Sequence, residues 1–558
     1  MQRTCTTCGT NFTVSEADEH FYEKMGVPVP TLCPDDMHRA RLSFRNEVDL
    51  YKRKCDKSGK EILTYYPPHA PQPIFENSVW WSDQWDPMEY GMPVSFERPF
   101  FEQFVELERR VPKSNIYVVE SENCDYTNYA THNKSCYLIF GSWFSESCLY
   151  GQSVYHSLGC IDCHYVEKCQ WCYECIDCLE CYETAFAQNS QSCTNSWFLF
   201  DCRNCENCIG CWNLRRKGYH IWNVPVSKEE FEKTLQKLRT SNEFVELFQE
   251  KFRKHVQEDV IHRAMIGENN DNVSGNFIYH SRNVVDSYNV QEAEDIGYSD
   301  RTLKQKDQYF CTGVHYGELA FNCLSVDFSH GIVGCMNGEH HTNTAYCIDC
   351  YSVEDCFGCV GLRQKKYCIL NKQYEKEEYE KLKTKIVEHM RKTPLRSPTG
   401  SSEGQAGEWG QYFPVAMNNF YYNRTLANDY FPLSRKEAEK RGYRWKEDEP
   451  KAPKGTHLTI PDSIADVPDS ITDEVLLCAS TQTNYRVTPQ ELAAYRKMGW
   501  PVPRENWQYR YSNRLGLRTP RKQWQRTCAN CQKPIQTSYA PDRPEIVHCE
   551  QCYMKEVY

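Results

Sequence analysis

Cysteine pairs near the C-terminus have the spacing of metal ligands. Cys528 and Cys531 form one Cys-x-x-Cys pair, and Cys549 and Cys552 form a second pair after seventeen intervening residues. Two such pairs can place four thiolates around one tetrahedral ion, the geometry that Zn²⁺ prefers. We therefore predict a structural zinc site at these four residues, with free or oxidised thiols as the alternative.

The N-terminal cysteines form a less complete set. Cys5 and Cys8 make one pair, but after Cys33 the sequence has Asp36 where a second pair would end. Because Zn²⁺ also accepts carboxylate oxygen and imidazole nitrogen, either Asp36 or His38 can complete the site. We predict a second zinc here, with a vestigial site as the alternative.

A basic and aromatic stretch precedes the C-terminal cysteines. Residues 485–526 contain ten Lys or Arg and two Glu, with Trp and Tyr interleaved. Arginine beside stacking aromatics suits RNA backbones and unpaired bases, and a local positive patch is the electrostatic sign of such a site. The candidate residues are Arg504, Arg510, Arg514, Arg518, Arg521, Trp507 and Trp524. The alternative is a solvated helix face.

Cysteines at every third residue in the middle of the chain suggest a third chemistry. One run is Cys169, Cys172, Cys175, Cys178 and Cys181, and another is Cys202, Cys205, Cys208 and Cys211. Stacked thiols could hold metal, an Fe–S cluster or switchable disulfides. The alternative is that cysteine serves as a small hydrophobic residue in a thin core, which also explains why Ser, Ala and Val share these positions. His341, in the same phase, is the one place to look for an unexpected site, and a histidine in a bulge is its alternative.

The same cysteines recur with a period of twelve. One series is Cys124, Cys136, Cys148, Cys160 and Cys172, and the other is Cys311, Cys323, Cys335, Cys347 and Cys359. A twelve-residue coil encloses so little volume that only small inward side chains fit, and successive coils would stack at about 4.7–4.9 Å. We predict two short β-solenoids with Cys-rich cores, at 116–226 and 263–374, in a mainly β fold with some α. The coil pattern resembles the β-helix of certain insect antifreeze proteins, but the Thr-Cys-Thr ladder for ice is missing, so we exclude that role.

The repeat regions and the terminal modules are each present twice in the chain. Cys208-Ile-Gly-Cys211 matches Cys356-Phe-Gly-Cys359 at an offset of 148, and Tyr22–Pro30 matches Tyr495–Pro503 at an offset of 473. Each terminal module lacks the metal ligands that the other module retains. Cys8, Cys33 and Asp36 correspond to Thr481, Asn506 and Tyr509, whereas Cys531, Cys549 and Cys552 correspond to Ser58 and to about Asn77 and Trp80. Such loss favours structural over catalytic zinc.

The run Cys5-Thr-Thr-Cys-Gly9, with Phe12, Gly26 and Cys33-Pro34, resembles a small bacterial probable zinc-binding domain of treble-clef or ribbon type. That family ends in Cys-Pro-x-Cys-Arg, from which Asp36 departs. The whole chain resembles cysteine-rich zinc-ribbon and β-solenoid proteins of uncultured bacteria. Neither resemblance implies an activity.

Composition narrows the functional class. The chain has 558 residues, 32 cysteines and a net charge of −11, so bulk charge does not favour polyanion binding. The N-terminus shows no apolar signal segment, and no run approaches 18 apolar residues. We therefore expect a cytoplasmic protein with reduced thiols and no membrane partner.

The predicted order places capping and linking segments between the repeats. It is a zinc module (1–60), an aromatic connector (61–115), the first solenoid (116–226), a helical segment (227–262), the second solenoid (263–374), a helix (375–393), a linker with an aromatic cap (394–470), the second module copy (471–527) and the C-terminal zinc ribbon (528–558). We predict a non-enzymatic zinc-binding scaffold or adaptor for a protein partner. RNA or ribosome binding through the C-terminal module is the first alternative, and a redox- or metal-active cysteine ladder is the second. The sequence contains no residue set that supports a reaction class.

Overall fold

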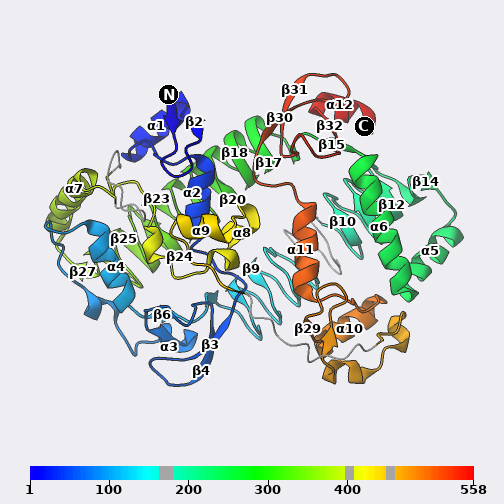
Figure 1. Cartoon of the computed structure of the whole chain (residues 1–558), viewed down its shortest axis with the longest axis horizontal. Coiled ribbons are helices and arrows are strands. Elements are labelled where there is room, and N and C mark those ends of the chain that lie inside the picture. The colour runs from blue at the N-terminus through cyan, green and yellow to red at the C-terminus, as the bar shows by residue number, and fades with distance from the viewer. Residues whose placement is uncertain (163–179, 396–406, 448–458) are drawn as a thin grey trace.

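The computed structural model describes residues 1–162, 180–395, 407–447 and 459–558 (Figure 1). Its fold is mixed α/β with many strands, which agrees with the prediction of a strand-rich chain that also contains helices. The predicted cysteine run from Cys169 to Cys178 lies outside the described residues.

In the first stack, residues 118–162 and 180–225, strands pair in parallel with the segment twelve residues further on, except that the last strand pairs antiparallel with the one before it. Trp197 pairs with Ile209, and Ile209 pairs with Ile221. Single bridges such as Glu122 to Lys134 continue this register between the named strands. The strands are β7 (Val118–Val119), β8 (Asn128–Thr131), β9 (Phe140–Trp143), β10 (Ala185–Gln188), β11 (Trp197–Phe200), β12 (Glu206–Trp212), β13 (Gly218–Ile221) and β14 (Val224–Pro225).

The second stack, residues 267–373, repeats this arrangement. Ile278 pairs with Val290, and Val290 with Thr302, again twelve residues apart. The strands are β16 (Gly267–Glu268), β17 (Asp271–Tyr279), β18 (Arg282–Gln291), β19 (Glu294–Gly297), β20 (Asp300–Tyr309), β21 (His315–Phe321), β22 (Leu324–Asp327), β23 (His330–Val333), β24 (Met336–Thr342), β25 (Ile348–Phe357), β26 (Lys366–Ile369) and β27 (Lys372–Gln373). A bulge between Val273 and Gly275 shortens the register to eleven before it.

The backbone explains the period of three. The residue before each inward position has a left-handed conformation, for example Tyr129 and His132, with φ of 50° and 53°. The next side chains, Ala130 and Asn133, are buried in the stack. A left-handed conformation costs roughly 1–2 kcal/mol for a non-glycine residue, and the parallel hydrogen bonds to both neighbouring coils offset this cost. Only small or hydrogen-bonded side chains fit the resulting core.

Two modules at the ends of the chain have matching elements. The N-terminal module contains β1 (Gln2–Thr4), β2 (Asn11–Thr13), α1 (Glu16–Met25), α2 (Pro34–Leu42), β3 (Tyr51–Lys54), β4 (Glu61–Thr64), β5 (Ile74–Phe75) and α3 (Asn77–Trp80). The C-terminal module contains β28 (Leu476–Leu477), β29 (Asn484–Tyr485), α10 (Pro489–Met498), α11 (Trp507–Leu517), β30 (Trp524–Thr527), β31 (Pro534–Thr537), β32 (Ile546–His548) and α12 (Glu550–Val557). After an offset of 473, α1 and α10, β3 and β30, and β4 and β31 have identical bounds.

The modules dock crosswise. The N-terminal module packs on the second stack, where the Tyr298 hydroxyl donates to Asp18 at 3.2 Å. The C-terminal module packs on the first stack, where the Tyr150 hydroxyl donates to Glu491 at 2.7 Å. The two tyrosines are equivalent at the stack offset of 148, and the two carboxylates are equivalent at the module offset of 473. Through these contacts the second stack with the N-terminal module and the first stack with the C-terminal module form two similar halves, and each half joins distant segments. Each module also contacts the other stack, since Asn276 of the second stack donates to the Thr519 hydroxyl at 3.0 Å and Gln152 of the first stack donates to Glu47 at 2.6 Å.

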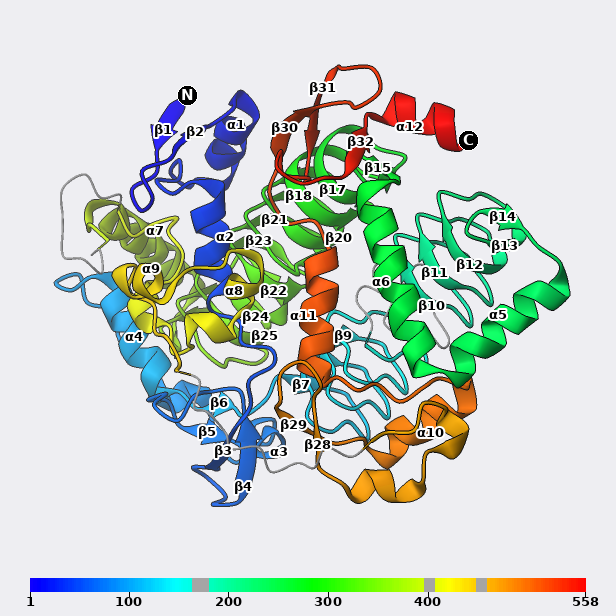
Figure 2. The same ribbon diagram turned by 45° about the vertical axis from the view of Figure 1, so that its right-hand side comes forward.

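Helix α11 lies between the two stacks, as Figure 2 shows in orange. Arg510 at its first turns pairs with Asp162 of the first stack, and Arg521 just beyond its end pairs with Asp300 of the second stack. The short β15 (Ile261–Arg263) pairs in parallel with β32, and β6 (Lys113–Ser114) pairs in parallel with β5. These connections fix each module to a stack.

Of the remaining helices, four pack on the stacks and the last two pack against α2 of the N-terminal module. They are α4 (Phe100–Arg110), α5 (Lys228–Thr240), α6 (Asn242–Glu258), α7 (Lys376–Lys392), α8 (Leu426–Tyr430) and α9 (Arg435–Lys440). Helix α4 packs on the second stack, where the ring centroids of Phe100 and Phe357 lie 5.1 Å apart. Among the described residues, no helix combines the length and the hydrophobicity needed to span a bilayer.

Candidate metal centres

The two modules together contain four copies of one turn–helix unit. Each unit is a hairpin turn followed by the start of a helix, and the units are unit 1 (residues 5–36), unit 2 (55–79), unit 3 (478–509) and unit 4 (528–552). In every unit the first turn residue is a buried cysteine, namely Cys5, Cys55, Cys478 or Cys528. Sequence comparison between the two ends predicts two sites per module, and the structure shows that both follow one plan.

The backbone hydrogen bonds repeat in all four units. The first cysteine's N–H donates to the carbonyl five residues later, from Cys5 to Thr10 at 2.9 Å and from Cys528 to Lys533 at 2.8 Å. The next residue donates to the carbonyl two residues before the helix N-cap, from Thr6 to Thr31 and from Ala529 to Val547. The equivalent bonds in units 2 and 3 are Cys55 to Lys60, Asp56 to Ile74, Cys478 to Thr483 and Ala479 to Arg504. The turn is therefore held against the helix start whether or not the ligands are complete.

Unit 4 brings the four predicted thiols together. One ligand atom from each of Cys528, Cys531, Cys549 and Cys552 lies within 4.8 Å of the others. Cys528 and Cys531 lie in the turn between β30 and β31, while Cys549 is the N-cap of α12 and Cys552 lies in its first turn. The Sγ atoms of Cys531 and Cys549 are 3.7 Å apart. This group could hold a metal ion.

Unit 1 gathers three thiols and one carboxylate. Cys5, Cys8, Cys33 and Asp36 also have ligand atoms within 4.8 Å of one another. Oδ2 of Asp36 lies 3.2 Å from the Cys5 sulfur, whereas Oδ1 pairs with Arg39 and, at 2.7 Å, with Arg441. The two arginines thus fix the carboxylate so that one oxygen faces the thiols.

His38 lies outside this group. Its Nδ1 is 3.0 Å from Nη2 of Arg41, and its ring is fully buried beside Phe431. Burial and the Arg41 charge lower the pKa of His38 well below its usual value. Of the two fourth ligands that the sequence allows, the geometry places Asp36 at the cluster and His38 in the packing of α2.

In each group, the surroundings lower the pKa of one cysteine and so favour its thiolate form. In unit 4, burial raises the pKa of Cys528, but the backbone N–H groups of Cys531 and Cys549 outweigh it and lower the pKa to about 6. In unit 1, a hydrogen bond with Cys33 lowers the pKa of Cys5 to about 4, and the same bond raises that of Cys33. A thiolate is the form of cysteine that binds metal.

Unit 2 keeps the fold without the ligands. The Cys55 sulfur accepts hydrogen bonds from the N–H groups of Ser58 and Glu76, at 3.3 and 3.2 Å. Glu76 is the N-cap of α3, as Cys549 is of α12. The predicted counterparts of Cys549 and Cys552, about Asn77 and Trp80, are therefore off by one residue, because the helix starts align Glu76 and Val79 with them.

Unit 3 has side-chain hydrogen bonds at the positions where unit 1 has ligand atoms. The Asn506 amide donates to the hydroxyls of Thr481 and Thr483, at 3.1 and 2.6 Å. Asn506 stands at the position of Cys33, and Thr481 at that of Cys8. Glu505 accepts a hydrogen bond from the Cys478 thiol at 2.7 Å. An amide–hydroxyl link thus joins the turn to the helix start where unit 1 offers ligands.

Three of the seven predicted nucleic-acid residues lie in the interior of the molecule. Arg510, Arg514 and Arg521 are 5%, 1% and 6% exposed, and the first two share Asp162. Arg504 pairs with Asp462, Arg518 lies over the Phe277 ring, Trp507 packs on Phe140 and Trp524 is half-buried. Burial and ion pairing withdraw Arg510, Arg514 and Arg521 from solvent, so these three do not form the predicted surface. Their charges instead join α11 to the stacks.

The stacked thiols of the described residues behave as a core. Cys193 donates to the carbonyls of Gln191 and Cys202, at 3.3 and 3.5 Å, and other inward cysteines repeat this pattern. All described cysteines are free thiols. The described residues contain no third group of ligand atoms as close as the two above. His341 is a satisfied core residue, because its ring nitrogens contact Thr344 and the Cys350 carbonyl.

Sequence reasoning missed the four-fold repetition and the crossed docking. The signal for the first was present, since Cys55 and Cys478 stand alone at positions where complete sites have cysteine pairs. The docking pairs, such as Tyr150 with Glu491, have no local signature because they are 341 residues apart. No family model matches the chain, and a search of curated proteins finds no match.

Proposed function

We propose that this protein is a non-enzymatic scaffold with two structural zinc ions, built from two β-solenoids that the terminal modules hold side by side. The four turn–helix units carry this proposal. Units 2 and 3 keep the same turn, hydrogen bonds and helix start with one cysteine each. An ion whose place can be taken by an amide–hydroxyl link or by packing acts on the fold rather than on a substrate.

Donor chemistry supports zinc at both sites. Four thiolates, or three with a carboxylate, suit Zn²⁺, which binds sulfur at about 2.3 Å in a tetrahedron. That geometry separates neighbouring sulfurs by about 3.8 Å. The sulfur atoms of Cys8 and Cys33 are 3.7 Å apart, and so are those of Cys531 and Cys549. All four ligand positions are filled by the protein, which leaves no open position for a substrate.

The solenoid interpretation rests on the parallel register of twelve and on the inward thiols. Each coil contacts only its neighbours, and such stacks present long outer faces suited to binding another protein. The aromatic caps and the modules cover parts of these faces. The uncovered faces are the surfaces that we assign to a protein partner.

Metal content per chain, measured by mass spectrometry on protein purified without oxygen, tests the proposal. We expect two zinc ions, one after Asp36→Asn and two after His38→Gln. Free-thiol counting on the same sample should find the solenoid cysteines reduced. Additional metal that survives loss of both sites would instead assign chemistry to the cysteine ladder, and a zinc-free but fully folded protein would remove the structural role.

A further inference from the structure

A cleft runs between the two stacks, outside both metal centres. Two adjoining cavities of about 320 and 70 Å³ form it, and both are lined by Trp143 and Tyr155 of the first stack and by Arg301 and His315 of the second. The combined volume lies in the range of small-molecule sites. Because both stacks contribute walls, the cleft exists only in the assembled molecule.

A column of side chains, one from each successive coil of the second stack, lines one wall of the cleft along its whole length. Its members follow the coil register, and in order they are Glu268, Tyr279, Gln291, Leu303, His315, Asp327 and Glu339. All seven line the two cavities. The middle of this wall is apolar or neutral, whereas the small cavity contains two carboxylates on adjacent coils.

The carboxylates of Asp327 and Glu339 lack a strong cation. Asp327 has His315 at 3.0 Å, and Glu339 has no hydrogen bond or ion pair among the described residues. Burial and the neighbouring Asp327 and Glu120 raise the pKa of Glu339 to about 7. Like charges opposite each other across strands are unfavourable. The arrangement therefore gains stability from any cation that enters the small cavity.

The nearby arginines do not supply that cation. Arg45 and Arg301 both line the small cavity, but they share the buried carboxylate of Glu47, at 2.5 and 3.4 Å. The Arg45 guanidinium also lies over the Tyr129 ring, 4.1 Å from its centroid. These contacts point both charges toward Glu47 and hold the N-terminal module at the junction of the stacks.

The opposite wall is aromatic. Trp143 and Tyr155 stand on adjacent coils of the first stack, and the Trp143 ring lies parallel to that of His315 with centroids 6.1 Å apart. Aromatic rings attract cations and also pack on hydrocarbon, so an aromatic wall facing carboxylates selects a ligand that has both properties. A bare metal ion would use only the carboxylates.

We propose that the cleft binds an organic ammonium ion. The charged nitrogen enters the small cavity beside Asp327 and Glu339. The apolar body lies in the larger cavity, between Leu303 and the Trp143 and Tyr155 rings. The proposal concerns a site apart from the zinc ions and does not depend on their identity.

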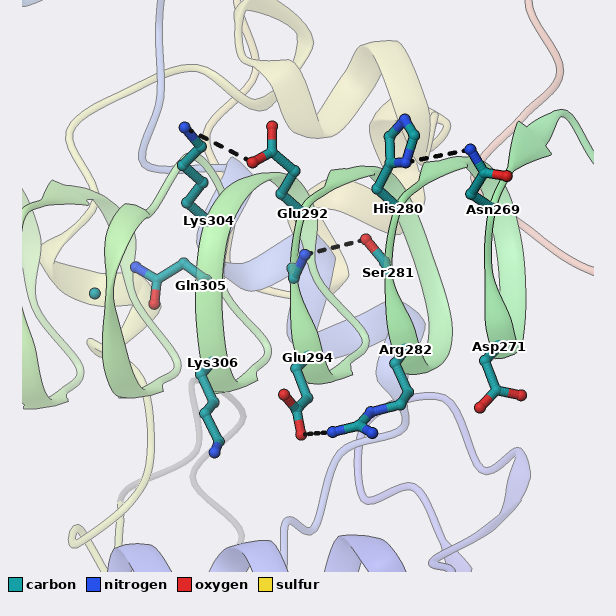
Figure 3. A pocket seen from close by; sticks show the side chains of 12 residues that line it. Asn269, Asp271, His280, Ser281, Arg282, Glu292, Glu294, Lys304, Gln305 and Lys306 are labelled. Carbon is teal, nitrogen blue, oxygen red and sulfur yellow. Dashed lines mark hydrogen bonds and ion pairs between the residues drawn. The ribbon is translucent and has the colours of Figure 1, made fainter.

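An open groove on the second stack offers a matched control. This open groove of about 660 Å³ lies between two rows of charged side chains (Figure 3). Here the charges neutralise each other along the coils, as Lys304 does with Glu292 at 3.7 Å and Arg282 with Glu294 at 2.5 Å. Glu292 is therefore a carboxylate on the same stack with a partner and without an aromatic wall.

Calorimetric titration of the full chain with 2-phenylethylammonium tests this assignment, with 2-phenylethanol as the neutral probe of the same shape. We expect saturable binding of the ammonium and at least about tenfold weaker binding of the alcohol, the difference that a desolvated cation on carboxylates and rings can supply. Glu339→Gln and Asp327→Asn should each weaken the ammonium severalfold, while Glu292→Gln should leave it unchanged.

Equal binding of the two probes would overturn the assignment, as would full ammonium affinity in both cleft variants. Absence of saturable binding for a set of aryl- and alkylammonium probes at millimolar concentration would also overturn it. Glu339→Gln keeps the side-chain shape at a partly solvated position, and circular dichroism with metal content would verify that each variant is folded. Loss of zinc with retained ammonium binding would separate this site from the structural role of the metal.

Discussion

Units 2 and 4 have the same backbone design but are held together differently. In unit 4, Cys531 is exposed, and Cys549 and Cys552 are half-buried. In unit 2, the chain continues over the turn, so that Cys55, Phe75, Val79 and Trp80 form a buried cluster, with Trp85 against it. On the proposed function, a metal ion is needed where too little apolar surface is available to close a small unit, and packing serves instead where the chain supplies a cover.

Replacing a metal ligand of unit 4 should have the largest effect on metal content and local stability. Cys531→Ser leaves three thiols, and metal binding supplies about 10–16 kcal/mol in small zinc-folded units, so we expect loss of one zinc and loss of hydrogen-exchange protection across 528–558. Its matched control is Ser58→Ala at the equivalent position of unit 2, which should change neither. Equal protection in both variants would contradict the difference between the units.

The second-largest effect is expected at the contacts that dock the modules on the stacks, and it should differ between the two halves. Asp162 and Phe310 occupy equivalent stack positions, but Asp162 pairs with Arg510 and Arg514, whereas Phe310 lies beside Arg41. Asp162→Asn removes the charge that the buried Arg514 and Arg510 share, while Arg510 keeps Glu491 at 3.8 Å, and should lower the free energy of unfolding by about 3–5 kcal/mol. Phe310→Leu should cost about 1–2 kcal/mol. Chemical denaturation of both variants measures the contrast, and similar losses would show that Asp162 is not the stronger anchor.

A four-thiol metal site can be built into unit 2, which has only Cys55. Since Ser58, Glu76 and Val79 align with Cys531, Cys549 and Cys552, the variant S58C/E76C/V79C gives unit 2 four thiols with Cys55. We expect the zinc content to rise from two to three per chain. S58C/N77C/W80C, which follows the shifted alignment, should leave it at two. A third zinc in the shifted variant instead would mean that the helix starts do not align as described.

The smallest effects are expected at the two docking hydroxyls. Tyr150→Phe removes a 2.7 Å hydrogen bond to the buried Glu491, and Tyr298→Phe removes a 3.2 Å bond to Asp18. Both acceptors are buried carboxylates, and a hydrogen bond to a charged group contributes about 1.5–3 kcal/mol, toward the lower end of that range for the longer bond. We therefore expect the larger loss of unfolding free energy for Tyr150→Phe. The reverse order would argue that the first half depends less on its module than the second.

The sequence specifies the local parts of this molecule well. The period of twelve indicates parallel stacking, and the Cys-x-x-Cys pairs identify both ligand clusters, because each ligand set lies within about one turn and one helix start. The fourth ligand of unit 1 was left open, since only Arg39 and Arg441 show how Asp36 is oriented. The burial of the C-terminal arginines could not be predicted, because their partners, Asp162 and Asp300, are hundreds of residues away and carry no motif.

Crossed docking has a consequence for synthesis on the ribosome. The N-terminal module is made first, but Tyr298 follows Asp18 by 280 residues, and Glu491 follows Tyr150 by 341. At about 5–20 residues per second, these intervals last roughly 14–56 s and 17–68 s. The N-terminal module lacks its second-stack surface during the first interval, and the first stack lacks the C-terminal module during the second, so the aromatic face of the first stack stays uncovered until α10 has been made.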